Sequence, residues 1–258
     1  MELLIAYESD PAGYNMASFI SKQMKKDGEI YHGKYFDLVI IPTPAISADW
    51  IEDKYHYDGY VFLSKHAAES GTLALTCHST GNFGDAMFGG FPRQVAIPHP
   101  HIQKSYMKKL WENKNLFSKF DIIIEATHHG PTALGKPTLF IEIGTTEKEW
   151  NDKQLCEDVS KVVVSVMSEK PQKYDVAICF GGTHYPSKFN KELMEGKLAL
   201  GTIIPKHGLD NVDLKLFDHI LKRNSEAKFA LVDWSGLGNN KQKIVDMINS
   251  SSLEMIKI

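Results

Sequence analysis

Two glutamates and two histidines lie close together in the middle of this sequence. Glu125 and Glu142 each lie at the end of a short apolar run that predicts a buried strand, and His128 and His129 lie between the two runs. A buried carboxylate is costly unless it is paired or bound to a metal. Because ligands of open α/β sheets bind beyond the carboxyl ends of the strands, this stretch indicates a functional site.

The same arrangement recurs elsewhere in the chain. Three more imidazoles, His66, His78 and His184, directly follow predicted strands at residues 60–63, 73–76 and 176–180. Any one of these side chains could be an ordinary surface group or the partner of a lysine. Their repeated position is less easily explained in that way, so we expect them to gather with the two glutamates at the carboxyl edge of one sheet.

The side chains expected at this edge are imidazoles and carboxylates, without a cysteine. This donor set suits Zn²⁺ held as in hydrolases, with one position left for water. Bound zinc lowers the pKa of that water to about 7 and polarises a carbonyl group. The sequence therefore predicts one or two zinc ions, although no short motif such as HExxH supports them. A metal-free site in which histidine acts as acid and base is the alternative.

A lysine-rich segment is the strongest candidate for contact with a polyanion. Residues 102–117 have the apolar periodicity of a helix, and they carry Lys104, Lys108, Lys109 and Lys114 against the single acid Glu112. A solvated helix face is the simpler interpretation of these charges. The functional interpretation is a phosphate-binding surface, with Tyr106 or Trp111 available to stack on a base.

Composition limits the class of protein. The chain has 258 residues, of which 43% are hydrophobic and 24% charged, as in ordinary soluble globular proteins. No apolar run approaches the roughly 18 residues of a membrane span. The three cysteines are far apart and form no CxxC, which fits a reducing cytoplasm better than a disulfide framework. A net charge of −3 does not indicate a general nucleic-acid binder, so RNA contact would need a local patch.

The elements that must position these residues alternate along the chain. Strands are expected at residues 3–7, 38–41, 60–63, 73–76, 122–124, 138–143, 176–180, 198–204 and 229–232, with a final edge strand at 253–258. Helices are expected at 12–26, 102–117, 212–221, from about 241, and after the capping-box pair Thr146 and Glu149. We find no repeat or linker. This pattern predicts a single α/β domain, residues 1–258, with a central mixed, mostly parallel sheet flanked by helices.

Five short segments together resemble the motifs of the archaeal and plant type of D-aminoacyl-tRNA deacylase. They are SerLysHis at 64–66, ThrCysHisSerThrGlyAsn at 76–82, ThrHisHisGlyPro at 127–131, GluIleGlyThrThr at 142–146 with Trp150 after it, and GlyGlyThrHisTyr at 181–185. The resemblance covers nearly the whole chain. It implies a zinc-dependent esterase that hydrolyses the ester between a D-amino acid and tRNA. It also implies a fold similar to peptidyl-tRNA hydrolases and nucleoside phosphorylases.

With this resemblance, each candidate residue receives an expected role. We expect zinc ligands at His66, His78, His128 and His184, and catalytic groups at Glu125, His129 and Glu142. We expect substrate contacts from Asn82, Lys104, Lys108, Lys109, Gly181 and Gly182. The chain departs from the family pattern at Thr202, where a histidine is usual, and His207 is only a speculative substitute. We therefore leave position 202 out of the catalytic set.

The resemblance implies tRNA charged with a D-amino acid as the partner. We expect a cytoplasmic monomer that does not bind a membrane. Two functions of other kinds remain open. One is a metal-independent, nucleoside phosphorylase-like enzyme with phosphate on the glycine turn 236–238. The other is a non-catalytic tRNA-binding module that uses the lysine face of residues 104–119.

Overall fold

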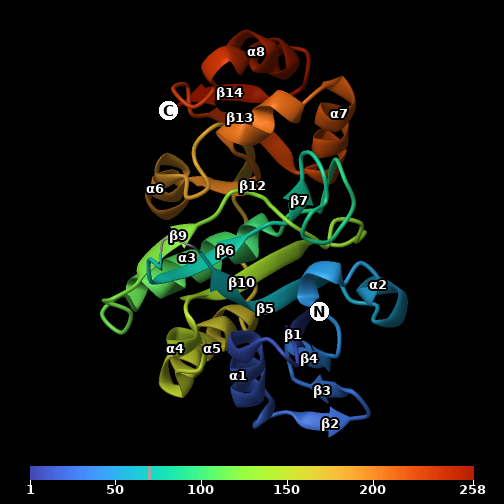
Figure 1. Cartoon of the computed structure of the whole chain (residues 1–258), viewed down its shortest axis with the longest axis vertical. Helices are drawn as coiled ribbons and strands as arrows, with labels where there is room; N and C mark the ends of the chain where they lie inside the picture. Colours follow the sequence, from blue (N-terminus) through green and yellow to red (C-terminus); the bar gives the residue numbers. More distant parts are fainter. Residues whose placement is uncertain (69–70) are drawn as a thin grey trace.

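The strands divide into two main sheets in the computed structural model, which describes residues 1–68 and 71–258 (Figure 1). The larger sheet has eight strands in the order β2-β3-β4-β1-β5-β10-β6-β9. In chain order they are β1 (Glu2–Tyr7), β2 (Lys25–Asp27), β3 (Ile30–His32), β4 (Phe36–Ile41), β5 (Gly59–Ala67), β6 (Ala74–His78), β9 (Asp121–Ile124) and β10 (Thr138–Thr145).

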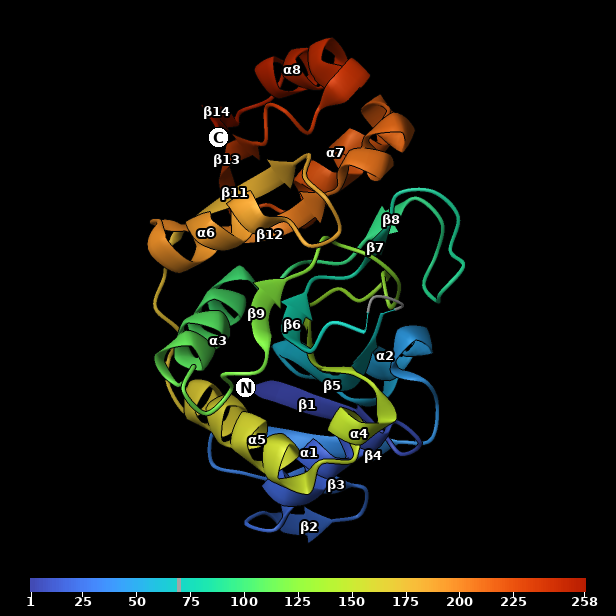
Figure 2. The ribbon, with the colours of Figure 1, turned by 60° about the vertical axis from the view of Figure 1, so that its left-hand side comes forward.

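The second sheet lies at the upper end of the molecule in Figure 1, together with α6, α7 and α8. Its four parallel strands have the order β12-β11-β13-β14. The strands are β11 (Asp175–Phe180), β12 (Leu198–Ile204), β13 (Ala227–Val232) and β14 (Glu254–Lys257), and the helices are α6 (Ser187–Glu195), α7 (Leu214–Arg223) and α8 (Lys241–Asn249). A short hairpin, β7 (Gly81–Asn82) with β8 (Gln94–Val95), lies between β6 and β9 in sequence and between the two sheets in space (Figure 2).

The predicted α/β class is confirmed, because the larger sheet is mixed and mostly parallel and is flanked by helices. Strands β4, β1, β5 and β10 are parallel neighbours, as are β6 and β9. The separate second sheet was not foreseen from the sequence. Its edge strand β14 does match the expected edge strand at 253–258.

Alternation along the strands decides which face of the larger sheet each side chain occupies. On β10, Leu139, Ile141 and Ile143 pack against the helices α1 (Pro11–Ser21), α3 (Pro100–Glu112) and α5 (Lys153–Met167). Phe140 belongs to the core on the other face, under η1 (Ala45–Ser47) and α2 (Ile51–Lys54). The helices α1 and α5 begin at Asp10 and Asp152, whose carboxylates accept main-chain hydrogen bonds of the first turn.

Two predicted helices are shorter than expected. The helix expected at 12–26 ends at Ser21, and residues 25–32 form the β2–β3 hairpin instead. The helix expected at 102–117 ends at Glu112. The capping box of Thr146 and Glu149 is confirmed, but it begins the short helix α4 (Glu147–Trp150) that precedes α5. No helix within the described residues is long and apolar enough to cross a membrane.

The prediction that the candidate residues gather at one carboxyl edge of the sheet is wrong. Strand β6 runs antiparallel to β10, with His78 opposite Phe140 and Thr76 opposite Glu142. Strand β9 runs parallel to β6 and therefore antiparallel to β10. Glu125, which follows β9, thus lies toward the edge of the sheet where β10 begins. The candidate residues can meet only across the face of the sheet, where strands of opposite direction lie side by side.

One hydrophobic core joins the two sheets. It contains residues of β10 and α5 together with Ala177 and Cys179 of β11 and Leu200 of β12. Its continuity supports the expectation that residues 1–258 form one domain, which stays a proposal. The three cysteines are buried and free.

Candidate functional site

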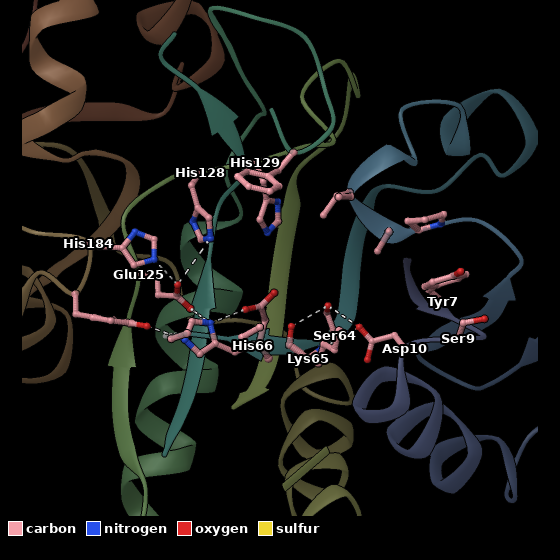
Figure 3. A pocket seen from close by; sticks show the side chains of 18 residues that line it. Tyr7, Ser9, Asp10, Ser64, Lys65, His66, Glu125, His128, His129 and His184 are labelled. Atoms are coloured by element: carbon pink, nitrogen blue, oxygen red, sulfur yellow. Dashed lines mark hydrogen bonds and ion pairs between the residues drawn. The ribbon is translucent and has the colours of Figure 1, made fainter. Parts of the chain in front are cut away.

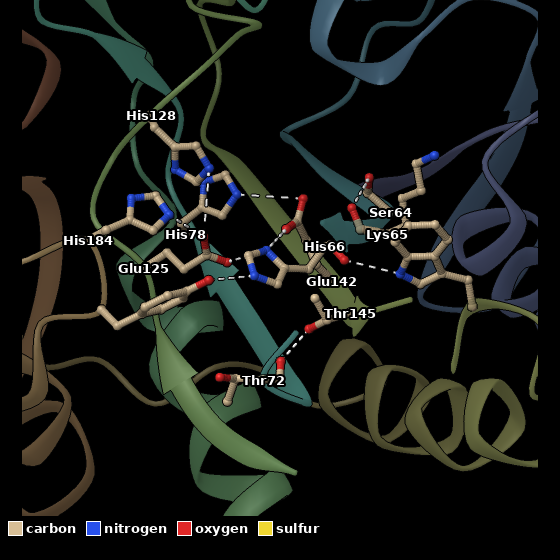
Figure 4. A network of polar contacts seen from close by, with 12 residues as sticks. Ser64, Lys65, His66, Thr72, His78, Glu125, His128, Glu142, Thr145 and His184 are labelled. Carbon is tan, nitrogen blue, oxygen red and sulfur yellow. Dashed lines mark hydrogen bonds and ion pairs between the residues drawn. The ribbon is translucent and has the colours of Figure 1, made fainter. Parts of the chain in front are cut away.

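The predicted site residues come together on the face of the larger sheet that lies away from α1, α3 and α5 (Figure 4). His66 on β5, His78 on β6 and Glu142 on β10 belong to three adjacent strands. Glu125 directly follows β9, and its side chain is fully buried. Because β6 carries Leu75 and Cys77 into the helix-covered core, the alternate residue His78 must point to this face.

His66 joins the two carboxylates. Its Nδ1 lies 3.1 Å from Glu125 Oε1 and 3.3 Å from Glu142 Oε2, and its Nε2 lies 2.7 Å from the hydroxyl oxygen of Tyr185. Burial lowers the pKa of His66, but the hydrogen bonds to Glu125 and Glu142 outweigh it and raise the pKa to about 10. Burial alone would raise the pKa of both carboxyls, but their contacts with histidines hold both pKa values below the usual range. The group is thus an imidazolium between two carboxylates.

Three other histidines contact the main chain through the same ring nitrogen. In His78, His128 and His129 the Nδ1 atom contacts a main-chain carbonyl oxygen, of Ser79 at 3.1 Å, Ala126 at 2.9 Å and Gly130 at 2.7 Å respectively. A carbonyl only accepts, so each Nδ1 must carry hydrogen, and each Nε2 has a free lone pair when its ring is neutral. This is the usual orientation of histidines that bind metal ions.

The histidine cluster fits a metal ion. The side chains of His78, His128 and His129 offer nitrogens that lie within 4.8 Å of one another. His78 Nε2 is buried without a hydrogen-bond partner, and its nearest charged neighbour is Glu142 Oε1 at 3.7 Å. Burial, assisted by the charge of neighbouring histidines, lowers the pKa of His128 well below its usual range and that of His129 to about 4. The pKa of His78 is instead raised, because the effect of burial is outweighed by its contact with Glu142. Since neutral imidazoles are the form that binds metal, His78 would have to release a proton when the ion binds.

The second sheet completes the site with His184. This residue lies in the turn after β11, and its Nε2 is 2.8 Å from Glu125 Oε2. His128 Nε2 approaches the same carboxylate oxygen at 3.8 Å. Glu125, His128 and His184 therefore form a second group whose ligand atoms lie within 4.8 Å of one another. The structure thus brings together all seven predicted catalytic and metal-binding residues, although it does not test their individual roles.

A cavity of about 670 Å³ opens onto these residues (Figure 3). Glu125, Glu142 and four of the histidines line one end of it, namely His66, His128, His129 and His184. The opposite end is formed by Tyr7, Ser9 and Asp10, and apolar side chains complete its wall, namely Pro44, Ala45, Ile46 and Phe88. The arrangement offers polar groups at one end and an apolar surface nearby, as in many sites for small organic groups.

The predicted contact of Lys104 with substrate is wrong. Its side chain is fully buried, and its Nζ donates hydrogen bonds to the carbonyl oxygens of Gly196, at 2.9 Å, and Leu198, at 2.6 Å. Lys108 and Lys109 are partly exposed on the same helix, α3. That helix covers the face of the sheet away from the cavity, so any contact of these lysines with RNA would be remote from the site.

The other three predicted substrate contacts do not line the cavity. The Asn82 amide nitrogen donates to the carbonyl oxygens of Gly89 and Phe91 and so supports the loop between β7 and β8. Gly181 and Gly182 have φ values of 99° and 83°. This left-handed conformation turns the chain from β11 toward His184, which explains why glycine is needed there. Direct substrate contact by these three residues stays a prediction.

Sequence reasoning did not include two residues of the site. Tyr185 contacts His66; in the sequence it is the last residue of the GlyGlyThrHisTyr segment, but it received no role there. Asp10 lies at the far end of the cavity and accepts hydrogen bonds from Gly13 N and Ser64 Oγ, both at 2.9 Å. It follows the first strand as the histidines follow theirs, so the same positional rule would have found it.

Thr202 has a structural role in this chain. It is fully buried, its N–H donates to Asn224 Oδ1 at 2.9 Å, and its hydroxyl accepts from Asn224 Nδ2 at 2.8 Å. Its omission from the catalytic set therefore agrees with its contacts. His207 is exposed and does not line the cavity, which leaves its suggested substitution without support.

Comparison with known proteins identifies relatives over the whole chain. The family model described as D-aminoacyl-tRNA deacylase matches residues 53–256. A protein named D-aminoacyl-tRNA deacylase from Cenarchaeum symbiosum is 57% identical, and the alignment covers 99% of each chain. One of the same name from Thermoplasma acidophilum is 36% identical over the full length of both. A crystal structure titled as a conserved protein of unknown function superposes with a TM-score of 0.93 at 28% identity, covering 100% of this chain and 95% of that one.

The fold and the site define an α/β enzyme of hydrolytic type, in which buried carboxylates and histidines meet at the end of a cavity. Within this class, the chain belongs to the D-aminoacyl-tRNA deacylase family.

Proposed function

We propose that this protein hydrolyses the ester bond of D-aminoacyl-tRNA. The observation that carries the proposal is the buried group of Glu125, His66 and Glu142, which lies beside the cluster of His78, His128 and His129 at the end of one cavity. Ester hydrolysis needs a proton acceptor, a positioned water and stabilisation of the developing oxyanion. The names of the relatives support the choice of substrate.

We propose Zn²⁺ as the cofactor, one or two ions per chain. His78, His128 and His129 would hold one ion, and Glu125, His128 and His184 offer ligand atoms for a second. Zinc, when bound, supplies a water of lowered pKa and polarises the ester carbonyl. These assignments exchange two of the expected roles. His129 joins the ligand candidates, whereas both ring nitrogens of His66 already have partners, which favours a positioning role.

The residues of the chain itself can move and hold the protons of the reaction. Glu142 lies between His66 and His78, where its carboxylate can accept a proton from the attacking water. His66 keeps both carboxylates oriented, and Tyr185 fixes the other edge of its ring at 2.7 Å. The apolar wall of the cavity can receive the amino-acid side chain and exclude bulk water from the ester.

The remaining expectations follow from this substrate. The partner is aminoacyl-tRNA, and we propose that the protein meets it in the cytoplasm as a monomer. The wording "D-aminoacyl" in the names of the relatives supports D-selectivity, which the cavity would have to provide by its shape and hydrogen bonds.

The phosphorylase-like alternative receives less support. The glycine turn after β13 would have to bind phosphate, but Asp233 Oδ1 already accepts hydrogen bonds from the N–H groups of Ser235 and Gly236, both at 3.2 Å. The same oxygen pairs with Lys188 Nζ at 2.7 Å. An anion would therefore meet a carboxylate in place of free donors.

The test uses tRNA charged with labelled D-tyrosine or labelled L-tyrosine. Hydrolysis is measured as release of the labelled amino acid. We expect wild-type protein to release D-tyrosine and to leave the L-ester nearly intact, and Glu142→Gln to lose the activity. A purified, folded, metal-loaded protein that releases neither amino acid faster than buffer would contradict the proposal. Equal release of both would retain the esterase and contradict its D-selectivity.

A further inference from the structure

The loop between β7 and β8, residues 83–93, extends from the side of the molecule (Figure 2). It exposes an unusual group of apolar side chains. Met87, Phe88 and Phe91 are 79%, 68% and 48% exposed. They are three of the nine large apolar side chains that are clearly exposed in the described residues, and they lie within five positions of one another. Single exposed apolar residues are ordinary, but a group of them indicates a surface that a partner covers.

The main chain of this loop is held firmly in place. Phe88 O accepts a hydrogen bond from Gly130 N at 3.0 Å, and Phe91 N donates to Thr132 Oγ1 at 2.9 Å. Asn82 adds two hydrogen bonds from its side chain to the loop. The apolar side chains are therefore presented by a fixed backbone, which lowers the entropy lost when a partner binds.

Glycine is required where the loop approaches the rest of the protein. Gly89 has a φ of 76°, and a Cβ atom there would lie 2.0 Å from Ile46 O. This contact brings the loop against the segment that forms the apolar wall of the cavity. Phe88 consequently lines the same cavity as Glu125 and His128, although most of its ring is open to solvent.

We propose that Phe88 is a stacking surface for the unpaired bases at the 3′ end of the RNA substrate, extended by Met87 and Phe91. This inference rests on the proposed function, because it assumes an aminoacyl ester of RNA. The ester and the terminal base are attached to the same ribose, so a base-binding surface must lie within one nucleotide of the reacting carbonyl. Phe88 meets this condition, since it shares the cavity with the catalytic groups and its main chain bonds to Gly130, next to His129.

Stacking suits this surface better than specific hydrogen bonding does. Unpaired bases bind to aromatic faces with little dependence on their sequence, and one such contact changes affinity by about 5- to 150-fold. A second copy of this chain is the main competing occupant of an exposed apolar group. The continuity of the group with the cavity favours the substrate.

The experiment compares wild type with Phe88→Ala, Phe88→Trp and the matched control Leu116→Ala. Leu116 is 66% exposed, close to the value for Phe88, and it follows α3 on the other side of the sheet. With D-aminoacyl-tRNA we expect Phe88→Ala to raise KM at least about 5-fold and to leave kcat and Tm nearly unchanged. Phe88→Trp should retain a near wild-type KM, and Leu116→Ala should have no effect.

A binding measurement separates this inference from the proposed activity. A short single-stranded oligonucleotide that ends in CC followed by 2-aminopurine should lose fluorescence on wild type and much less on Phe88→Ala. This readout does not require hydrolysis. An inactive wild type would therefore contradict the proposed function, while the fluorescence measurement would still test the stacking. An unchanged KM for Phe88→Ala in active protein, or equal fluorescence quenching by both proteins, would overturn the inference. So would a wild-type dimer that dissociates when Met87, Phe88 and Phe91 are replaced by serine, measured by light scattering.

Discussion

His66 and Glu142 are diagonal neighbours on two parallel strands. Glu142 lies opposite Ser64 and His66 lies opposite Gly144, yet the side chains of His66 and Glu142 meet at 3.3 Å on the same face of the sheet. Diagonal neighbours two positions apart are within reach of long side chains. The His66 ring can lie over Gly144 because that residue has no side chain, and a Cβ atom there would be 2.8 Å from His66 Cδ2.

The first prediction concerns the space above Gly144 that the His66 ring occupies. Gly144→Ala should displace the His66 ring from both carboxylates, because the new methyl group would otherwise overlap it. Overpacking of this kind costs about 1–3 kcal/mol. We expect a moderate fall in Tm and a turnover lowered by at least about 10-fold, since a displaced His66 can no longer orient the two catalytic carboxylates. Steady-state kinetics with unchanged turnover would show that the position of His66 is unimportant.

The second prediction concerns Glu142. Glu142→Gln keeps the shape of the side chain and removes the charge that would accept a proton, so we expect turnover to fall at least about 100-fold while the protein stays folded. Glu149→Gln is the control, because Glu149 belongs only to the capping box of α4. It should lower Tm slightly and leave turnover intact. Near wild-type hydrolysis by Glu142→Gln, together with a clearly lowered Tm, would instead indicate a structural carboxylate.

The third prediction concerns metal content. We expect elemental analysis to find at least one zinc ion per chain. Chelation should abolish turnover and lower Tm, and added Zn²⁺ should restore both, because the histidine cluster would otherwise leave His78 Nε2 buried without a partner.

Two histidine variants serve to localise the metal. His78→Ala should lose the zinc, whereas His101→Ala should retain it, because His101 is also buried but pairs with Glu226 at 3.0 Å and does not line the cavity. Active protein that contains no metal after thorough chelation would refute the zinc proposal and favour the metal-free alternative.

The fourth prediction separates the lysines of α3. Lys104→Met should lower the free energy of unfolding by about 2 kcal/mol, because two buried carbonyl oxygens lose their donor, and should leave tRNA affinity unchanged. If this face binds the RNA backbone, exchange of Lys108 and Lys109 for glutamate should leave the free energy of unfolding nearly unchanged. It should weaken tRNA binding and reduce the dependence of that binding on salt.

Charge reversal at Lys25 and Lys26 is the control for a general effect of net charge, since both are exposed on the distant β2 strand. Filter binding at several salt concentrations and urea unfolding measure the two effects. Equal reductions of affinity in the α3 and β2 variants would remove α3 from the interface.

Periodicity was a sound guide to the strands and a poor guide to the ends of helices. The strand expected at 198–204 agrees with β12 at both ends, because its apolar residues are flanked by clear breaks. The helix expected at 12–26 was too long, because Met24 continues the apolar stripe although the chain has already turned into the β2–β3 hairpin. Apolar spacing alone does not record where the main chain finds strand partners.

The chemistry of the site was determined by the sequence, because a carboxylate or imidazole beside a buried strand must find a partner wherever the strand lies. Glu125, Glu142 and the five histidines could be selected on that ground alone. Their meeting place could not, because strand direction is a long-range property. The reversal of β6 and β9 moved the site from the edge of the sheet to its face.

Tertiary structure also decided which charged side chains are available to a substrate. Lys104 and Lys108 look equivalent in the sequence, since both belong to one lysine-rich helix. Packing of α3 against β12 buries Lys104 beneath two carbonyl groups and leaves Lys108 partly exposed. Local sequence sets the type of side chain, but only the contacts between distant elements determine whether it faces water, a core or a cavity.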